Sequence, residues 1–224
     1  MRWPLALVCS CAAALAVSCS EPAPRDDTQP HYDVPGIALQ VPNLPGWEQD
    51  GTLAPVDPAG GGTVFRLVRS GAVAGTPRIS VIVDPVGGSP ATLEEFLTRS
   101  LRQMAELEKQ GSIHIDFVDQ RPARVGPRTA YRVRHEYSVG RGAQQMAITQ
   151  VATLLVLDGR GVAVIAAGRT ELFHPLATSV ESLLAGVATS TRAMPTVRPL
   201  PGAPVRSQPL FVEPIDLGKV GGRN

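Results

Sequence analysis

Apolar and polar residues alternate along several short stretches of the chain, which is the pattern of strands with one buried face. Residues 63–69 place Phe65 and Leu67 on the same side. Residues 78–84 alternate in the same way, and the glycine- and proline-containing link between the two stretches predicts an antiparallel hairpin. Further strands are predicted at residues 37–41, 113–118, 120–126, 129–138, 145–157 and 161–168. The last two are the most apolar and are therefore expected at the centre of a sheet.

Two other stretches repeat their apolar residues at helical spacing. The first begins with a capping-box pattern, Thr92 followed by Glu95, and is expected to end at Gly111. The second is expected to be capped by Thr170 and to carry Pro175 in or before its first turn. Together the patterns predict an α+β fold, an α/β sandwich with an antiparallel sheet of about six to seven strands and two main helices.

The first twenty residues have the layout of an export signal. Arg2 precedes an apolar run that is too short to cross a membrane as a helix. Residues 15–18, which lead into Cys19, resemble a bacterial lipobox. We therefore expect the Cys19 thiol to carry a diacylglyceryl group, with a possible further acyl chain on its amine, because the thiolate is the nucleophile. The alternative is an ordinary signal peptide cut between Ser18 and Cys19, which releases a soluble protein.

Composition divides the chain into four parts. These are a lipoprotein signal peptide at residues 1–18, a lipid-anchored proline-rich tether at 19–36, a sandwich domain at 37–188 and a Pro/Gly-rich tail at 189–224. Disorder is expected for the tail, although the apolar residues 210–212 could instead dock on a partner. Ser20 lacks the carboxylate that marks inner-membrane retention, so the periplasmic side of the outer membrane is expected in a Gram-negative cell. In any other cell we expect the outer face of the plasma membrane.

Charge and cysteine content restrict the possible functions. The chain has 21 Lys and Arg residues, one of them Arg2 in the signal, against 20 Asp and Glu residues. This balance argues against nucleic acid as a partner. The sequence has no cysteine after Cys19, so an internal disulfide cannot stabilise the exported chain.

Known catalytic and metal-binding motifs are absent from the sequence, so neither a cofactor nor a metal is expected. His114 and Asp116 share one strand face, but no further ligands accompany them. His135 alternates with apolar residues and is expected to be a satisfied structural histidine of the core rather than a catalytic one. The two remaining histidines are His31 in the tether and His174 at a helix start.

Arginines gather between residues 121 and 134, and Arg128, Arg132 and Arg134 are the candidates for a patch that binds anionic lipid head groups or an acidic partner. The alternative is an ordinary polar strand face, neutralised by nearby carboxylates such as Asp119 and Glu136.

The order of elements resembles a known family of lipoproteins. The matching stretches are residues 37–47, 79–83, 93–97, 125–131, 150–157 and 161–167. With its acylated N-terminus, the chain resembles the Lpq-type (LpqN/LpqT) lipoproteins of actinobacteria. The resemblance implies the α/β sandwich of the photosystem PsbP proteins, the Ran-binding Mog proteins and the DcrB lipoprotein. It also implies a binding or accessory role, with no catalytic residues to carry over.

We therefore expect a membrane-anchored, non-catalytic protein of the cell envelope that binds an envelope lipid, glycolipid or protein partner. One alternative is an enzyme with an unrecognised site in the groove between sheet and helix. A structure with His135 within hydrogen-bond reach of a carboxylate and a hydroxyl would favour this alternative. Another is a structural protein that docks on an envelope assembly through residues 194–224.

Overall fold

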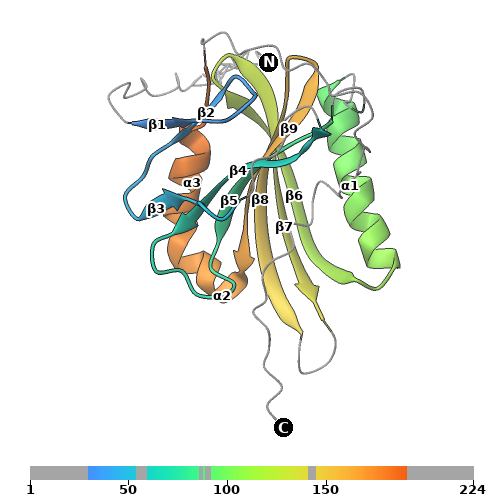
Figure 1. Cartoon of the computed structure of the whole chain (residues 1–224). Coiled ribbons are helices and arrows are strands. Elements are labelled where there is room, and N and C mark those ends of the chain that lie inside the picture. Colours follow the sequence, from blue (N-terminus) through green and yellow to red (C-terminus); the bar gives the residue numbers. More distant parts are fainter. Residues whose placement is uncertain (1–29, 54–59, 86–87, 89–91, 141–144, 191–224) are drawn as a thin grey trace, which may run out of the picture.

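The computed structural model of the chain describes residues 30–53, 60–85, 88, 92–140 and 145–190 (Figure 1). The expectations for the signal peptide, for Cys19, for most of the tether and for nearly all of the tail lie outside these residues. Two sheets and two main helical regions form the described part, and they account for most of the elements that the hydrophobic pattern predicts.

The main sheet has seven antiparallel strands in the order β3-β4-β5-β9-β8-β7-β6. Their bounds are β3 Trp47–Gln49, β4 Gly62–Arg69, β5 Arg78–Val83, β6 Ile113–Val125, β7 Arg128–Val139, β8 Met146–Leu157 and β9 Arg160–Arg169. The predicted α+β fold with a large antiparallel sheet is thus confirmed. The two most apolar strands, β8 and β9, lie inside the sheet, as the sequence predicts.

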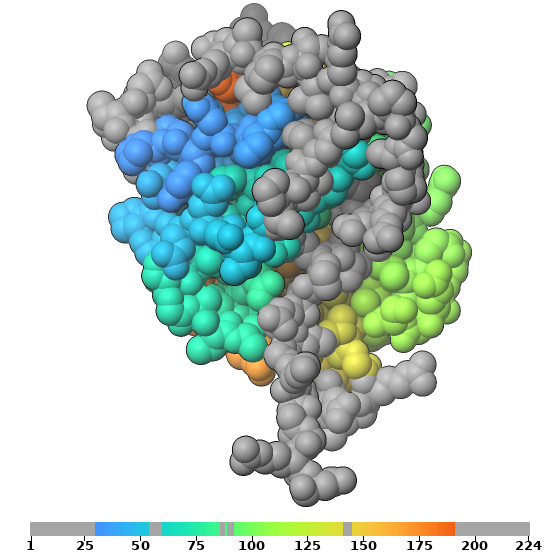
Figure 2. Space-filling model, viewed as in Figure 1, coloured from blue at the N-terminus to red at the C-terminus, as the bar shows by residue number. Residues whose placement is uncertain are grey.

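Helices cover both faces of this sheet (Figure 1). The long helix α1 (Leu93–Lys109) lies on one face, and α2 (Thr170–Phe173), the 3-10 turn η3 (His174–Leu176) and α3 (Ala177–Gly186) lie on the other. A small sheet in the order β1-β2-β10 packs on the α3 side, with bounds β1 His31–Asp33, β2 Leu39–Pro42 and β10 Ala188–Thr189. Figure 2 shows α1 in green and the blue N-terminal strands on opposite flanks of the molecule.

Each central strand contributes to two cores because its side chains alternate between the faces. On β9, Val162 and Val164 pack on the α3 side, whereas Ala163 and Ile165 pack on the α1 side. All four side chains are at most 1% exposed. Burial on both faces explains why the sequence of this strand is apolar throughout.

The long helix begins and ends where the sequence predicts. The Thr92 hydroxyl accepts a hydrogen bond from the Glu95 amide at 3.1 Å, and this bond satisfies an N–H group that the helix leaves free. Phe96, Ser100 and Met104 form its buried face. The last turn is followed by Gly111, whose positive φ lets the chain reverse into β6.

The second helical region differs from the expected single helix. Pro175 lies in η3 and divides the region into α2 and α3, because proline has no N–H to donate and its ring clashes with the preceding turn. The expected cap is also wrong. Arg169 occupies the N-cap position, but its side chain makes no capping hydrogen bond to the helix. The Thr170 hydroxyl accepts a hydrogen bond from the Thr149 hydroxyl at 3.1 Å.

Two strands also differ from the prediction. The two extended pieces at residues 113–118 and 120–126 form one 13-residue strand, β6. Pro122 is tolerated inside it because β6 is an edge strand, where a missing backbone donor can face away from the sheet. The short strand β1 lies within the stretch interpreted as tether, and it pairs with β2 through Tyr32 opposite Val41.

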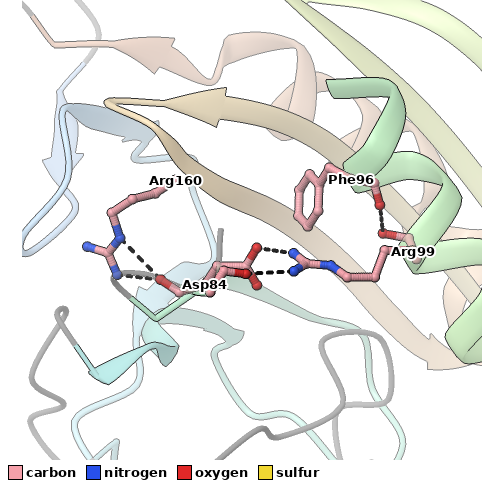
Figure 3. A network of polar contacts seen from close by, with 6 residues as sticks. Asp84, Phe96, Arg99 and Arg160 are labelled. Atoms are coloured by element: carbon pink, nitrogen blue, oxygen red, sulfur yellow. Dashed lines mark hydrogen bonds and ion pairs between the residues drawn. The ribbon is translucent and has the colours of Figure 1, made fainter. Parts of the chain in front are cut away.

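A buried aspartate ties β5, α1 and β9 together near the start of the long helix (Figure 3). Asp84 is 1% exposed, and its carboxylate pairs with the Arg99 guanidinium. Arg160 approaches from the opposite side and donates to the Asp84 carbonyl oxygen at 2.6 and 3.1 Å. Burial raises the pKa of Asp84, and the bonds and charge of Arg99 act against that rise. The cluster therefore fixes α1 on the sheet.

Gly161 leaves the space that this cluster occupies. A Cβ atom at this position would overlap Asp84 Oδ2 and would lie 3.0 Å from Phe96 Cε2. Gly161→Ala should therefore lower the free energy of unfolding by about 1–3 kcal/mol, measured by urea denaturation. Gly51→Ala is the matched control, because nothing lies within 4 Å of the added atom. Equal stability of the two variants would contradict the packing described for Asp84.

Candidate binding surface on strands β6 and β7

A hollow of about 300 Å³ opens at the β6 edge of the main sheet. Its lining residues are Phe117 and Asp119 from β6 and Arg134 and Glu136 from β7. Phe117 is 48% exposed and forms the apolar part of the lining. The hollow therefore combines one apolar wall with charged groups of both signs.

Strand register brings these four residues together. Asp119 lies opposite Arg134, and Phe117 lies opposite Glu136. A register shift between Ile115 and Phe117 turns Phe117 away from the α1 side, where Ile115 packs. Without this bulge, strict alternation would direct Phe117 under α1 with Ile113 and Ile115. The bulge is therefore what places an aromatic ring at the hollow.

Two of the three arginines beside the hollow, Arg132 and Arg134, have carboxylate partners. Arg134 Nε donates to Glu136 Oε1 at 3.1 Å. Arg132 Nη1 donates to Glu181 Oε2 of α3 at 2.7 Å. Burial lowers the pKa of Arg132, the nearby charge of Arg121 lowers it further, and Glu181 opposes both effects. We call these residues the β6–β7 surface: Phe117, Asp119, Arg121, Arg132, Arg134, Glu136 and Glu181.

The structure places the three arginines that the sequence singles out along the single strand β7. Arg132 and Arg134 share a strand face, as expected from their spacing. Arg128 is exposed at the end of β7, opposite Val125 at the turn. Glu136 is the expected counter-charge for Arg134, whereas Glu181 was not foreseen. Because three carboxylates accompany Arg121, Arg132 and Arg134 on the β6–β7 surface, this surface is close to neutral.

Two residues of the surface, Phe117 and Glu181, are not among those that the sequence pattern singles out. Phe117 and Val118 are adjacent apolar residues that interrupt the alternation of β6, and this interruption is the signal for the bulge. Glu181 gives no such signal, since it lies 49 positions from Arg132 and only the packing of α3 on the sheet joins them.

His135 lies on the opposite face of β7, beneath α1, and is 1% exposed. The expectation that it faces the core is confirmed, but the expectation of a satisfied histidine is wrong. Neither ring nitrogen has a hydrogen-bond partner among the described residues. Burial lowers the pKa of His135 to about 4, so the ring is neutral at pH 7. The carboxylate and hydroxyl that an acid–base site requires are therefore not in hydrogen-bond contact with this ring.

Gln150 lies opposite His135 in the neighbouring strand β8. Its Oε1 atom accepts a hydrogen bond from the Tyr137 hydroxyl at 3.4 Å, while its Nε2 atom is buried without a partner in the described structure. The α1 side of the sheet thus contains a small polar cluster inside an otherwise apolar core, and this cluster bears on stability at low pH.

The other histidines lie apart from the hollow and from the polar cluster around His135. His114 is 70% exposed between Glu108, 3.4 Å from Nδ1, and Asp116, 3.8 Å from Nε2. His31 belongs to β1, and His174 begins η3. Within the described ranges, no three His, Cys, Asp or Glu side chains are arranged to hold a metal ion. In the same ranges, no helix has the length and apolar character needed to cross a bilayer.

No family model matches this chain, and no curated protein matches it in sequence. Solved structures do resemble it in fold. The cyanobacterial PsbP protein of Synechocystis sp. PCC 6803, CyanoP, has a TM-score of 0.50 and 11% identity, with 71% of this chain and 91% of that chain covered.

Two further structures match with lower scores. LpqN of Mycobacterium tuberculosis, described as involved in cell envelope biogenesis, has a TM-score of 0.43 and 12% identity over 74% of this chain and 87% of that chain. The Ran-binding protein Mog1p of Saccharomyces cerevisiae has a TM-score of 0.43 and 12% identity over 72% and 96%. At such low identity the likeness concerns the fold alone. The chain has the α+β fold of the PsbP type, and the CyanoP match carries this conclusion.

Proposed function

We propose that this chain is a non-catalytic accessory lipoprotein of the cell envelope, which binds a protein partner at the β6–β7 surface. Acyl chains on Cys19 hold it at the membrane, and the sandwich domain presents the hollow beside Phe117 to the partner. The observation that carries the proposal is the hollow itself, which has an exposed aromatic wall and balanced charges.

The charge balance favours a polypeptide over an anionic lipid. A lipid phosphate gains most from arginines that have no other partner. Here Arg132 and Arg134 already pair with Glu181 and Glu136, which leaves Arg121 as the one arginine of this surface without an ion pair among the described residues. A polypeptide segment carries charges of both signs together with apolar side chains, so it can exchange ion pairs with this surface and also cover Phe117.

The buried histidine supports a binding role over catalysis. A general base has to reach a proton on a substrate and is usually oriented by a second polar group. His135 is 1% exposed, and its ring nitrogens contact no polar group of the described chain. Its surroundings are those of a core residue and not those of an acid–base site.

Photo-crosslinking in the producing cells tests the proposed surface. A benzophenone amino acid in place of Phe117, in the full chain, should form an adduct with another protein. The same group in place of Val73, which is 65% exposed on the β4–β5 link, is the matched position and should not form that adduct. Arg134→Gln should reduce the Phe117 adduct about tenfold, because it removes a charged group that lines the hollow.

Arg102→Gln is the control for this substitution, because Arg102 is an exposed arginine on α1, which covers the opposite face of the sheet. It should leave the adduct unchanged. Adducts only with lipid, adducts only with a second copy of the chain, or equal adducts from positions 117 and 73 would each contradict a protein partner at this surface.

A further inference from the structure

The outer edge of β6 is open in the described structure. β6 is the last strand of the main sheet and pairs only with β7. Residues 116–122 are all exposed, among them Phe117 and Val118, which are 48% and 43% exposed. Such an edge offers unpaired backbone groups to a further strand. Charged side chains, a proline and a register shift mark this edge, as is common for edge strands, so its residues rather than its exposure decide what can pair with it.

The residues of this edge are complementary to themselves. When two copies of β6 run antiparallel with Gln120 opposite Gln120, positions equally distant from Gln120 face one another. Asp119 then faces Arg121 of the second copy. The apolar positions match as well, in the pairs Phe117 with Ala123 and Val118 with Pro122. Cross-strand pairs of opposite charge and apolar cross-strand pairs both stabilise a sheet.

Neighbouring registers lose this complementarity. Centring the pair on position 119 places Asp119 opposite Asp119, and centring it on position 121 places Arg121 opposite Arg121. Like charges in directly opposite positions destabilise a sheet. The charges therefore disfavour the two adjacent registers and favour the one centred on Gln120.

Two charges at this edge have no ion-pair partner inside the described chain, and a second copy would supply one to each. Asp119 and Arg121 form no ion pair with other described residues. Arg121 also lies directly opposite Arg132, and this like charge contributes to the lowered pKa of Arg132. A carboxylate on the free side of Arg121 would offset that repulsion.

The ends of the stretch limit how far pairing extends. Pro122 has no N–H to donate, and the register shift between Ile115 and Phe117 interrupts the strand on the other side of Gln120. Pairing two copies of the same edge uses that edge in both, so the assembly closes at two. The opposite edge of the sheet, β3, has only three residues and offers little for further growth.

We propose that the chain forms a closed homodimer in which two β6 strands pair antiparallel about Gln120. The two seven-stranded sheets then become one continuous sheet, with both α1 helices on one face and both hollows on the other. Arg121 of each copy lies beside Asp119 of the other at the rim of the hollow. The dimer uses Asp119 and Arg121 of the β6–β7 surface, so it shares residues with the proposed partner site. The disulfide test reads only the contact between two copies and the crosslinking test reads only the contact with another protein, so either proposal can fail without the other.

A single introduced cysteine tests the register directly. The sequence has no cysteine after Cys19, so Gln120→Cys in the full chain adds one thiol at the two-fold axis. Opposite residues of an antiparallel pair have Cα atoms about 4.5–5.5 Å apart, which suits a disulfide. The oxidised chain should run as a dimer on non-reducing gels. Val73→Cys, at an exposed position far from β6 in the sequence, is the control and should remain monomeric.

Charge reversal then distinguishes disulfides formed in this register from disulfides formed by random collision of two chains. In the Gln120→Cys chain, Asp119→Arg or Arg121→Asp alone should reduce the dimer about tenfold, because each creates two like-charge pairs. The double variant Asp119→Arg/Arg121→Asp should restore it, and so should a mixture of the two single variants. Equal disulfide formation by Gln120→Cys and Val73→Cys, or no recovery in the double variant, would overturn the proposal. Thermal unfolding confirms that each variant is folded.

Discussion

Replacing Cys19 with serine should release nearly all of the chain from the membrane fraction. Serine lacks the thiolate that accepts diacylglycerol, and the acyl chains bring about 0.8 kcal/mol of membrane affinity for each buried methylene. Two or three such chains exceed the marginal binding of one. The Cys19→Ser chain should therefore shift to the soluble fraction and lose incorporation of radiolabelled palmitate.

The signal peptide contains two further cysteines that serve as controls for this experiment. Cys9 and Cys11 lie in the apolar run before the expected cleavage position. Cys9→Ser and Cys11→Ser should therefore sediment and incorporate label like the unmodified chain. If the Cys19→Ser chain still sediments with membranes in the same amount as the unmodified chain, the lipid anchor and the proposed membrane localisation are both wrong.

Acid should destabilise this protein through His135. Burial holds the folded-state pKa of His135 at about 4, below the ordinary value of 6.5. Between pH 6.5 and pH 4 the unfolded chain therefore binds one more proton at this residue than the folded chain. The free energy of unfolding should fall by about 1.4 kcal/mol per pH unit as pH falls through this window, or about 3 kcal/mol in all.

Comparison with His135→Leu isolates this contribution. The variant has no titrating group at this position, so its unfolding free energy should lack that part of the acid dependence. At pH 7 its stability should match or exceed that of the parent chain, because a buried polar ring without partners is replaced by an apolar side chain. Urea denaturation is read from Trp47, which is 3% exposed and donates a hydrogen bond to Ser179 at 2.9 Å.

His114→Leu is the matched control, since His114 is 70% exposed. It should keep the acid dependence of the parent chain. The same pH dependence in His135→Leu and in the parent would show that His135 is not held neutral by burial.

Much of the fold follows from local sequence signals. Alternation in β4 and β5 and the apolar runs of β8 and β9 predict strands, since a strand with one or two buried faces imposes those patterns. Thr92 and Glu95 mark the start of α1 because the cap satisfies its own backbone groups. The turn at Asp158 and Gly159, both with positive φ, likewise reflects a local backbone preference.

The predictions from sequence are wrong where the effect of a residue depends on a neighbour that is distant in the chain. Pro122 suggests a break, yet β6 continues through it because no described strand pairs on its outer side. Thr170 has the composition of a cap, but its hydroxyl bonds to Thr149 in β8. The length of β1 is three residues, which is too short for any periodicity to reveal it.

The candidate site was only partly visible in the sequence. The spacing of Arg132 and Arg134 predicts a shared strand face, and the structure confirms it. Their partners decide the character of the surface, and Glu181 reaches Arg132 from a helix 49 positions away. A patch that looks basic in one strand is therefore balanced in the folded chain, because charges from separate elements add only after packing.

The sequence by itself determined the α+β class, the order of most elements and the expectation of an acylated Cys19, because each rests on short-range patterns of polarity and backbone preference. Only the tertiary structure decided that Phe117 borders a hollow, that His135 is buried without a partner and that β6 has an open edge. Those features depend on strand register and on which surfaces are brought together, and contacts between distant residues set both.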